Sequence, residues 1–148
     1  MTRALAALLF IWVGLLAGVS FVATPAKFLA PSLPMAQALD VGRWTFHVLA
    51  RIEWGFVLAT AALVALLWPR GRGIGVIAGL ITTVALILAV ESFALRPLLD
   101  ARVLRIMAGE AVPASSSHIV YIVLEAARLA LVCAAGVLAL RRIEGLRA

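Results

Sequence analysis

The sequence predicts an all-α integral membrane protein, built as a single domain in which four transmembrane helices form an antiparallel bundle. The 148-residue chain is 65% hydrophobic and only 14% charged, with a mean hydropathy of +1.14, whereas soluble domains contain about 25% charged residues. Its apolar residues also gather into four long stretches, each close to the ~20 residues that a helix needs to cross a bilayer core. These stretches are residues 4–23, 45–68, 74–95 and 119–140.

The first stretch, residues 4–23, follows a short basic start and has features of a signal peptide as well as of a transmembrane helix. It is longer than the usual signal core of about 7–15 residues. Gly14 and Gly18 form a small-xxx-small pair, which suits a helix that packs closely against another helix. We therefore expect a retained first span.

The second stretch, residues 45–68, has Trp44 and Trp68 at its two ends, as expected for anchors at the membrane interfaces. In the connector before it, residues 35–39 predict a short helix that Gly42 ends. The connector after it, residues 69–73, is a tight basic turn of the kind common in cytoplasmic loops.

The third stretch contains a second small-xxx-small pair, Gly75 and Gly79, so close contacts are expected within the bundle or between subunits. After it, residues 97–107 alternate apolar and charged side chains. This pattern indicates either an amphipathic helix in the membrane interface or an irregular hairpin. Before the fourth stretch, the serine run 115–117 predicts a helix cap.

The basic residues lie at the ends of the stretches, where they meet lipid headgroups and set the topology. The net charge of +6 therefore does not indicate a nucleic-acid partner. Four spans place both termini on one side, and the basic turn at 69–73 favours the cytoplasm for that side. We expect a multi-pass protein of the bacterial inner membrane, with the lipid bilayer as its surroundings.

Charged residues interrupt three of the four stretches, and an ionisable group in hydrocarbon costs about 2.5–3.5 kcal/mol even on the mildest scale. Such residues usually mark function, although interhelical ion pairs can also serve only to hold helices in register. At 1.5 Å per residue, all of them fall in the outer half of the bundle. They are Arg51, Glu53, Glu91, Glu125 and Arg128.

Helical geometry indicates how these charges pair. Arg51 and Glu53 lie about 200° apart around their helix, so each needs a partner on another helix. We expect Arg51 to pair with Glu125 or Glu91, and Glu53 to pair with Arg128. His118, Tyr121, Glu125 and Arg128 are three or four residues apart and form one stripe on the last helix. The predicted result is a hydrated polar pocket open to the outside, lined by Arg51, Glu53, Glu91, Tyr121, Glu125 and Arg128.

Three functions fit this pattern. The first is the binding or transport of a small polar or ionic ligand in the pocket, and the second is a structural or accessory role in a homo-oligomer or larger membrane complex. The third is a membrane redox protein, with His47 and His118 as ligands of heme or a metal. No cofactor is favoured and no catalytic motif is present, so no enzymatic activity is predicted. The single cysteine, Cys133, excludes an intrachain disulfide.

The first third of the chain resembles the signature of a bacterial membrane family of unknown function, whose vertebrate relative is transmembrane protein 205. This resemblance implies four spans, a first outer connector with proline and aromatic residues, and a histidine that opens the last span, which His118 matches. The pairs Arg51-x-Glu53 and Glu125-x-x-Arg128 lie outside the signature. The motifs are Trp12-x-Gly14, Gly18-x-x-Phe21, Pro25-x-x-Phe28, and Leu33-Pro34 leading to Phe46.

Overall fold

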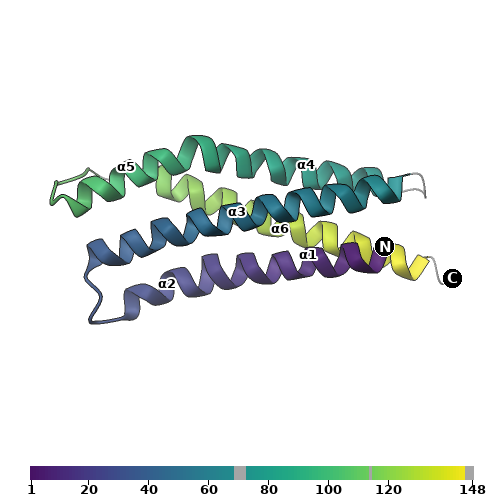
Figure 1. Ribbon diagram of the computed structural model, residues 1–148, viewed down its shortest axis with the longest axis horizontal. Coiled ribbons are helices and arrows are strands. Elements are labelled where there is room, and N and C mark those ends of the chain that lie inside the picture. Colours follow the sequence, from purple (N-terminus) through teal and green to yellow (C-terminus); the bar gives the residue numbers. More distant parts are fainter. Residues whose placement is uncertain (69–72, 114, 146–148) are drawn as a thin grey trace.

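A computed structural model of the protein describes residues 1–68, 73–113 and 115–145. Four long helical segments lie side by side in an antiparallel bundle, and the N-terminus lies at the same end as the end of the last helix (Figure 1). Each segment is long and apolar enough to cross a membrane. The segments are Thr2–Leu29, Met35–Leu67, Ile74–Met107 and Ser117–Ile143. The predicted all-α, four-span bundle is therefore confirmed.

Two of the four segments are uninterrupted α-helices, and the other two change their helical geometry along the way. The second segment is α3 (Met35–Leu67) and the fourth is α6 (Ser117–Gly145). The first consists of α1 (Thr2–Leu16), the π-helical η1 (Ala17–Ala23), α2 (Thr24–Ala26) and the 3-10 turn η2 (Lys27–Leu29). The third consists of α4 (Ile74–Val90), the π-helical η4 (Glu91–Leu95) and α5 (Arg96–Met107).

Both π-helical segments are followed by a proline. Pro25 lies two residues after η1, and Pro97 lies two residues after η4. A proline cannot donate the helical hydrogen bond, and its ring clashes with the carbonyl four residues before it. The wider π turn, which closes through a bond to the fifth residue, accommodates this conflict without breaking the helix.

The second helix is much longer than the sequence predicts. The 33 residues of α3 span about 50 Å, compared with a hydrocarbon core of about 30 Å. The prediction that a separate short helix ends at Gly42 is wrong, because α3 runs through this position. Gly42 is buried, and a Cβ atom there would overlap Nζ of Lys27. The glycine therefore makes room for a lysine from η2 and does not end a helix.

The connector after the third stretch is helical, as one of the two alternatives predicts. Residues 97–107 lie within α5, which continues the third segment and is not a separate helix. The loop after α5 is held to it by an ion pair of 2.6 Å between Arg105 Nε and Glu110 Oε2, and by a bond from Arg102 to the carbonyl of Pro113. Residues 69–72 of the predicted basic turn at 69–73 lie outside the described residues.

A capping interaction precedes α6, as the serine run predicts. The backbone N–H of Ser117 donates to the Ser115 hydroxyl oxygen at 3.2 Å. The backbone N–H of Val120 donates to the carbonyl of Ser116 at 3.0 Å. The first contact satisfies one of the N–H groups that the start of a helix leaves without an intrahelical partner, and the second is the first regular bond of α6.

The glycine pairs do not mediate close helix contacts within the bundle. Gly14, Gly18, Gly75 and Gly79 are all exposed, and no described residue beyond the surrounding helical turn comes closer than 4.0 Å to a Cβ built at any of them. The close approach occurs instead at Gly136 of α6, where a Cβ atom would lie 3.2 Å from the Phe10 ring of α1. Contacts between subunits through the exposed pairs stay a prediction.

Candidate functional site

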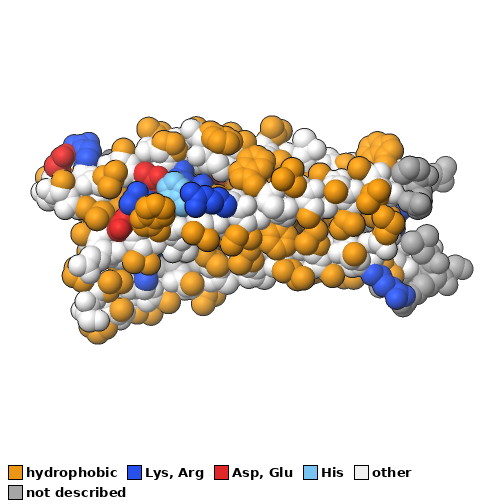
Figure 2. Space-filling model, viewed as in Figure 1, with side chains coloured by type: hydrophobic (Ala, Val, Ile, Leu, Met, Phe, Trp, Pro, Cys, Tyr) orange, Lys and Arg blue, Asp and Glu red, His pale blue; other side chains and the backbone are white. Residues whose placement is uncertain are grey.

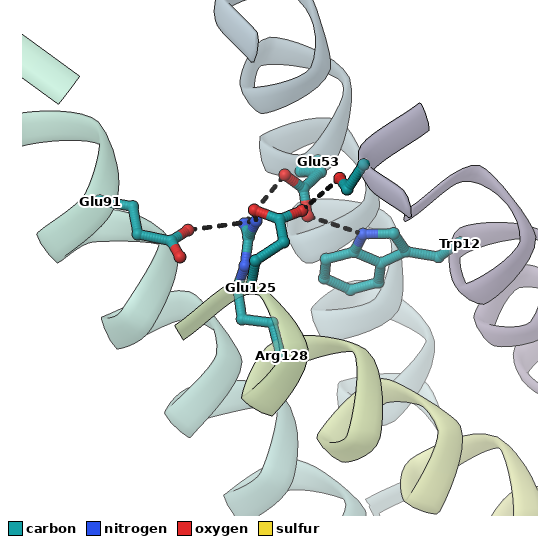
Figure 3. A network of polar contacts seen from close by, with 6 residues as sticks. Trp12, Glu53, Glu91, Glu125 and Arg128 are labelled. Carbon is teal, nitrogen blue, oxygen red and sulfur yellow. Dashed lines mark hydrogen bonds and ion pairs between the residues drawn. The ribbon is translucent and has the colours of Figure 1, made fainter. Parts of the chain in front are cut away.

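Arg128 of α6 is the centre of a buried charged network in which three glutamates converge on one guanidinium (Figure 3). Its Nη1 lies 2.9 Å from Oε2 of Glu53 on α3. Its Nη2 lies 2.6 Å from Oε2 of Glu125 on α6 and 3.1 Å from Oε2 of Glu91 at the start of η4. The predicted pair between Glu53 and Arg128 is confirmed. We call these four residues the Arg128 network.

The first helical segment contributes two neutral donors to the network. The indole Nε1–H of Trp12 donates to Oε1 of Glu53 at 3.1 Å, and the hydroxyl of Ser20 donates to Oε1 of Glu125 at 2.6 Å. Hydrogen bonds to a charged acceptor are stronger than those between neutral groups. All four helical segments of the bundle are therefore joined at this one level.

Helical spacing explains why these side chains meet. Glu125 and Arg128 are three residues apart on α6 and share its buried face. Glu53 belongs to the buried stripe of α3, one turn from Leu49 and from Val57. Glu91 is the first residue of η4, so the π-helical geometry begins where its carboxylate meets the network.

The network is enclosed, whereas the sequence predicts a hydrated pocket open to the outside. The exposed fraction is 0–2% for the four members of the Arg128 network and 5% for Tyr121. Within this enclosure, the three carboxylates contact the guanidinium of Arg128. Tyr121 lies in the same buried stripe of α6, and its ring packs edge-on against Phe46 with the centroids 5.3 Å apart. The assignment of these residues as a ligand-binding site stays a prediction.

Arg51 is not part of the network, and the prediction that it pairs with Glu125 or Glu91 is wrong. Both glutamates pair with Arg128, while Arg51 lies on the exposed face of α3 without an ion pair to any described residue. The helical angle between Arg51 and Glu53 correctly places them on opposite faces. It does not say which face is buried, and Glu53 occupies the buried one.

The two histidines lie apart from the network. Nε2 of His47 lies 2.7 Å from Oδ2 of Asp100 on α5, in a half-exposed pair, and His118 at the start of α6 is exposed. Figure 2 shows that most charged side chains visible on this face gather toward the end of the bundle that carries α5. Among the described residues, no group of three or more His, Cys, Asp or Glu side chains is placed to hold a metal ion. A heme or metal function for the histidines stays a prediction.

Sequence reasoning missed Trp12 and Ser20 as members of the site, although both stand out in the first stretch. Ser20 is its only hydroxyl residue, and Trp12 lies in the middle of the span, away from the interfaces where tryptophan is enriched. It also missed Arg96, the first residue of α5, which is only 7% exposed and whose Nε makes no hydrogen bond within the described part of the chain. A lone polar side chain within a span is the signal that could have identified these positions.

Comparison of the chain with known proteins finds no matching family model, no similar curated protein and no similar solved structure. The resemblance to the transmembrane protein 205 family therefore stays a prediction. On its own structure, the chain is a four-span helical membrane protein with a buried charged network.

Proposed function

We propose that the protein binds a small cation, in the simplest case a proton, at the carboxylates of the Arg128 network, as a step in the uptake or transport of that ion. The charge of the network supports this proposal. Three carboxylates share one guanidinium, so the fully ionised network has a net charge of −2. Uncompensated charge in the interior of a membrane bundle is costly, and the uptake of a cation removes that cost.

The buried guanidinium of Arg96 does not balance the charge of the network. Arg96 is buried and attracts Glu91 electrostatically. When Arg96 is counted with the network, three negative charges still face two positive ones. The remaining charge of −1 matches one bound proton or one monovalent cation.

Enclosure favours a very small ion over an organic ligand. The carboxylate oxygens of Glu53, Glu91 and Glu125 converge on the guanidinium and leave no exposed surface for a larger molecule. A proton needs no cavity, because it is held in an O–H bond of a carboxyl group. Chains of acidic side chains inside membrane bundles are typical of proton relays.

The distribution of buried polar groups favours access from the end that carries α5. Between the network and the termini, the core is almost entirely apolar and includes Leu5, Leu9, Val64 and Ile77. Toward α5, the buried Arg96 follows Glu91 on the same helical segment. With cytoplasmic termini, as the basic residues predict, this end faces the outside of a bacterial inner membrane, and we include that orientation in the proposal.

The test is proton uptake by protein reconstituted into liposomes that contain a pH-sensitive dye. We compare the wild type with the triple variant E53Q/E91Q/E125Q, which keeps side-chain volume and removes the ionisable groups. Glu110→Gln is the matched control, because Glu110 is half-exposed in the loop after α5 and outside the network. We expect uptake to be lost in the triple variant and unchanged in the control. Equal uptake in the triple variant and the wild type would refute the proposal.

Arg51 supports a second candidate, a role as a subunit of a homo-oligomer or larger membrane complex. It is exposed near the middle of α3 and has no partner among the described residues. A charged side chain on a lipid-facing surface must reach the headgroups or meet an acidic group on another protein. The test is the mass of the particle in mild detergent for the wild type and Arg51→Gln. A wild-type assembly that the substitution dissociates supports this role, and a monomeric wild type contradicts it.

We also propose that the chain is related to the transmembrane protein 205 family. The motifs of the first third support this relation, as does the position of His118 as the second residue of α6. The test is the structure of a member of that family, which should show four spans with the same packing of the first and last helices.

A further inference from the structure

Glu91 differs from the other two glutamates of the network in its hydrogen bonds. Glu53 accepts from Arg128 and from Trp12, and Glu125 accepts from Arg128 and from Ser20. Among the described residues, neither oxygen of Glu91 has a hydrogen-bond partner, although its side chain is fully buried. Its ion pair, 3.1 Å to Nη2 of Arg128, is with a nitrogen that lies closer to Glu125, at 2.6 Å.

This difference means that Glu91 is the least stabilised of the three as an anion. A carboxylate that accepts several hydrogen bonds is favoured in its charged form, and one that lacks them in a buried place is not. Two of the groups that face Glu91 are carboxylates, which repel a third negative charge, and its nearest cation is shared with both. The ionisable groups that face Glu91 from α3, α5 and α6 are Glu53, Arg96, Tyr121, Glu125 and Arg128.

We infer that Glu91 is the carboxyl group that holds the bound proton in the enclosed arrangement of the Arg128 network. The proton comes from water at the end of the bundle that carries α5, and it forms one O–H bond on Glu91 while Glu53 and Glu125 stay ionised. This leaves two carboxylates against Arg128, with Arg96 as the second cation. The inference rests on the proposed function and names the residue that performs it.

The local backbone is consistent with this role. Glu91 is the first residue of η4, and π-helical turns inside α-helices occur frequently at functional sites. Only one oxygen of Glu91 is paired with the guanidinium of Arg128 (Figure 3). The proton can therefore be placed on the other oxygen. A proton on that oxygen would leave the contact with Arg128 in place.

The first test is infrared difference spectroscopy of the wild type and of the three single variants Glu53→Gln, Glu91→Gln and Glu125→Gln, titrated from mildly acidic to alkaline pH. We expect the wild type to show the C=O band of a protonated carboxylic acid in a dry environment at neutral pH. This band should be absent only in Glu91→Gln. A band that persists in Glu91→Gln and disappears in Glu53→Gln or Glu125→Gln would overturn the assignment.

Thermal stability in detergent is the second test, and it does not depend on observing the band. Glutamine mimics a neutral glutamic acid, so Glu91→Gln should keep or raise the melting temperature, while Glu53→Gln and Glu125→Gln should lower it. A larger drop for Glu91→Gln than for the other two would overturn the assignment even if ion uptake is confirmed.

The two proposals can fail separately. If uptake depends on the three glutamates but the band of the protonated carboxylic acid disappears in Glu53→Gln or Glu125→Gln and persists in Glu91→Gln, the assignment of Glu91 fails and the proposed function stands. If the triple variant takes up protons as fast as the wild type, the proposed function fails, and the assignment fails with it.

Discussion

The half of the bundle that holds the termini and the half that holds α5 are built from the same helices but have different interiors. Near the termini, the core contains apolar side chains such as Leu5 and Leu9 of α1 and Ile77 of α4. Toward α5, the core contains the Arg128 network and Arg96. The stability of the apolar half depends on close packing, to which many side chains contribute. The polar half depends on a few matched charges, so each of its residues matters more.

Arg128→Met is expected to have the largest effect on stability. It leaves three buried carboxylates without their shared cation, which we expect to lower the free energy of unfolding by about 3–5 kcal/mol. Denaturation in detergent micelles measures the change. Arg51→Met is the matched control, because Arg51 is exposed and should change stability by no more than about 0.5 kcal/mol. Equal losses for the two arginines would contradict the distinction between buried and exposed charge.

Leu9→Ala probes the apolar half. Leu9 is fully buried in the core cluster, so its truncation leaves a cavity. We expect a loss of about 2–3 kcal/mol, at the low end of the range for such substitutions, because lipid is as apolar as leucine and only the packing of the side chain stabilises the bundle. Ile11→Ala is the control, since Ile11 is 62% exposed. If Leu9→Ala costs more than Arg128→Met, the polar half is not the more sensitive of the two.

Trp12→Phe separates the hydrogen bond of the indole from its packing. A phenylalanine can keep the stacking on Phe56, now at 5.5 Å between ring centroids, but it cannot donate to Glu53. Loss of a hydrogen bond to a charged group should cost about 1.5–2 kcal/mol. Trp68→Phe, at an exposed tryptophan, should be neutral in the same denaturation experiment. A similar change for both tryptophans would mean that the bond to Glu53 contributes nothing.

Asp100→Asn is expected to have the smallest effect. The pair of Asp100 with His47 is half-exposed, so its contribution should be about 0.5 kcal/mol and should shrink at high salt. Denaturation at low and high ionic strength measures both quantities. A loss of about 3 kcal/mol, independent of salt, would place this pair with the buried network and weaken the comparison.

The sequence predicts the four spans well because length and hydropathy alone determine which segments can cross a bilayer. It also predicts the pair of Glu53 and Arg128, because the two charges are opposite in sign and lie at similar depth. The predicted pairing of Arg51 is wrong, although Arg51 also has a depth and a charge that suit a pair with Glu125 or Glu91. Only the packing of α3 decides which face of this helix is buried, and Arg51 lies on the exposed face.

The predicted boundaries of the second span are wrong for a different reason. A glycine such as Gly42 is typical of the end of a helix. Whether it ends the helix or makes room for a neighbouring side chain depends on a tertiary contact. Here that neighbour is Lys27, which comes from the preceding segment. The enclosure of the site is likewise invisible in the sequence, because it depends on how tightly four helices pack.

The π-helical η4 gives its helix one register before residue 91 and another after residue 95. If residues 91–95 adopted α-helical geometry without losing a residue, the residue that the wider π turn now accommodates would rotate all of α5 by about 100° relative to α4. Asp100 would then turn away from His47, and Arg96 would leave the core, without any change in the residues of α5 themselves. The π-helical winding of this short segment, and not the chemistry of α5, therefore determines which side of α5 faces the bundle.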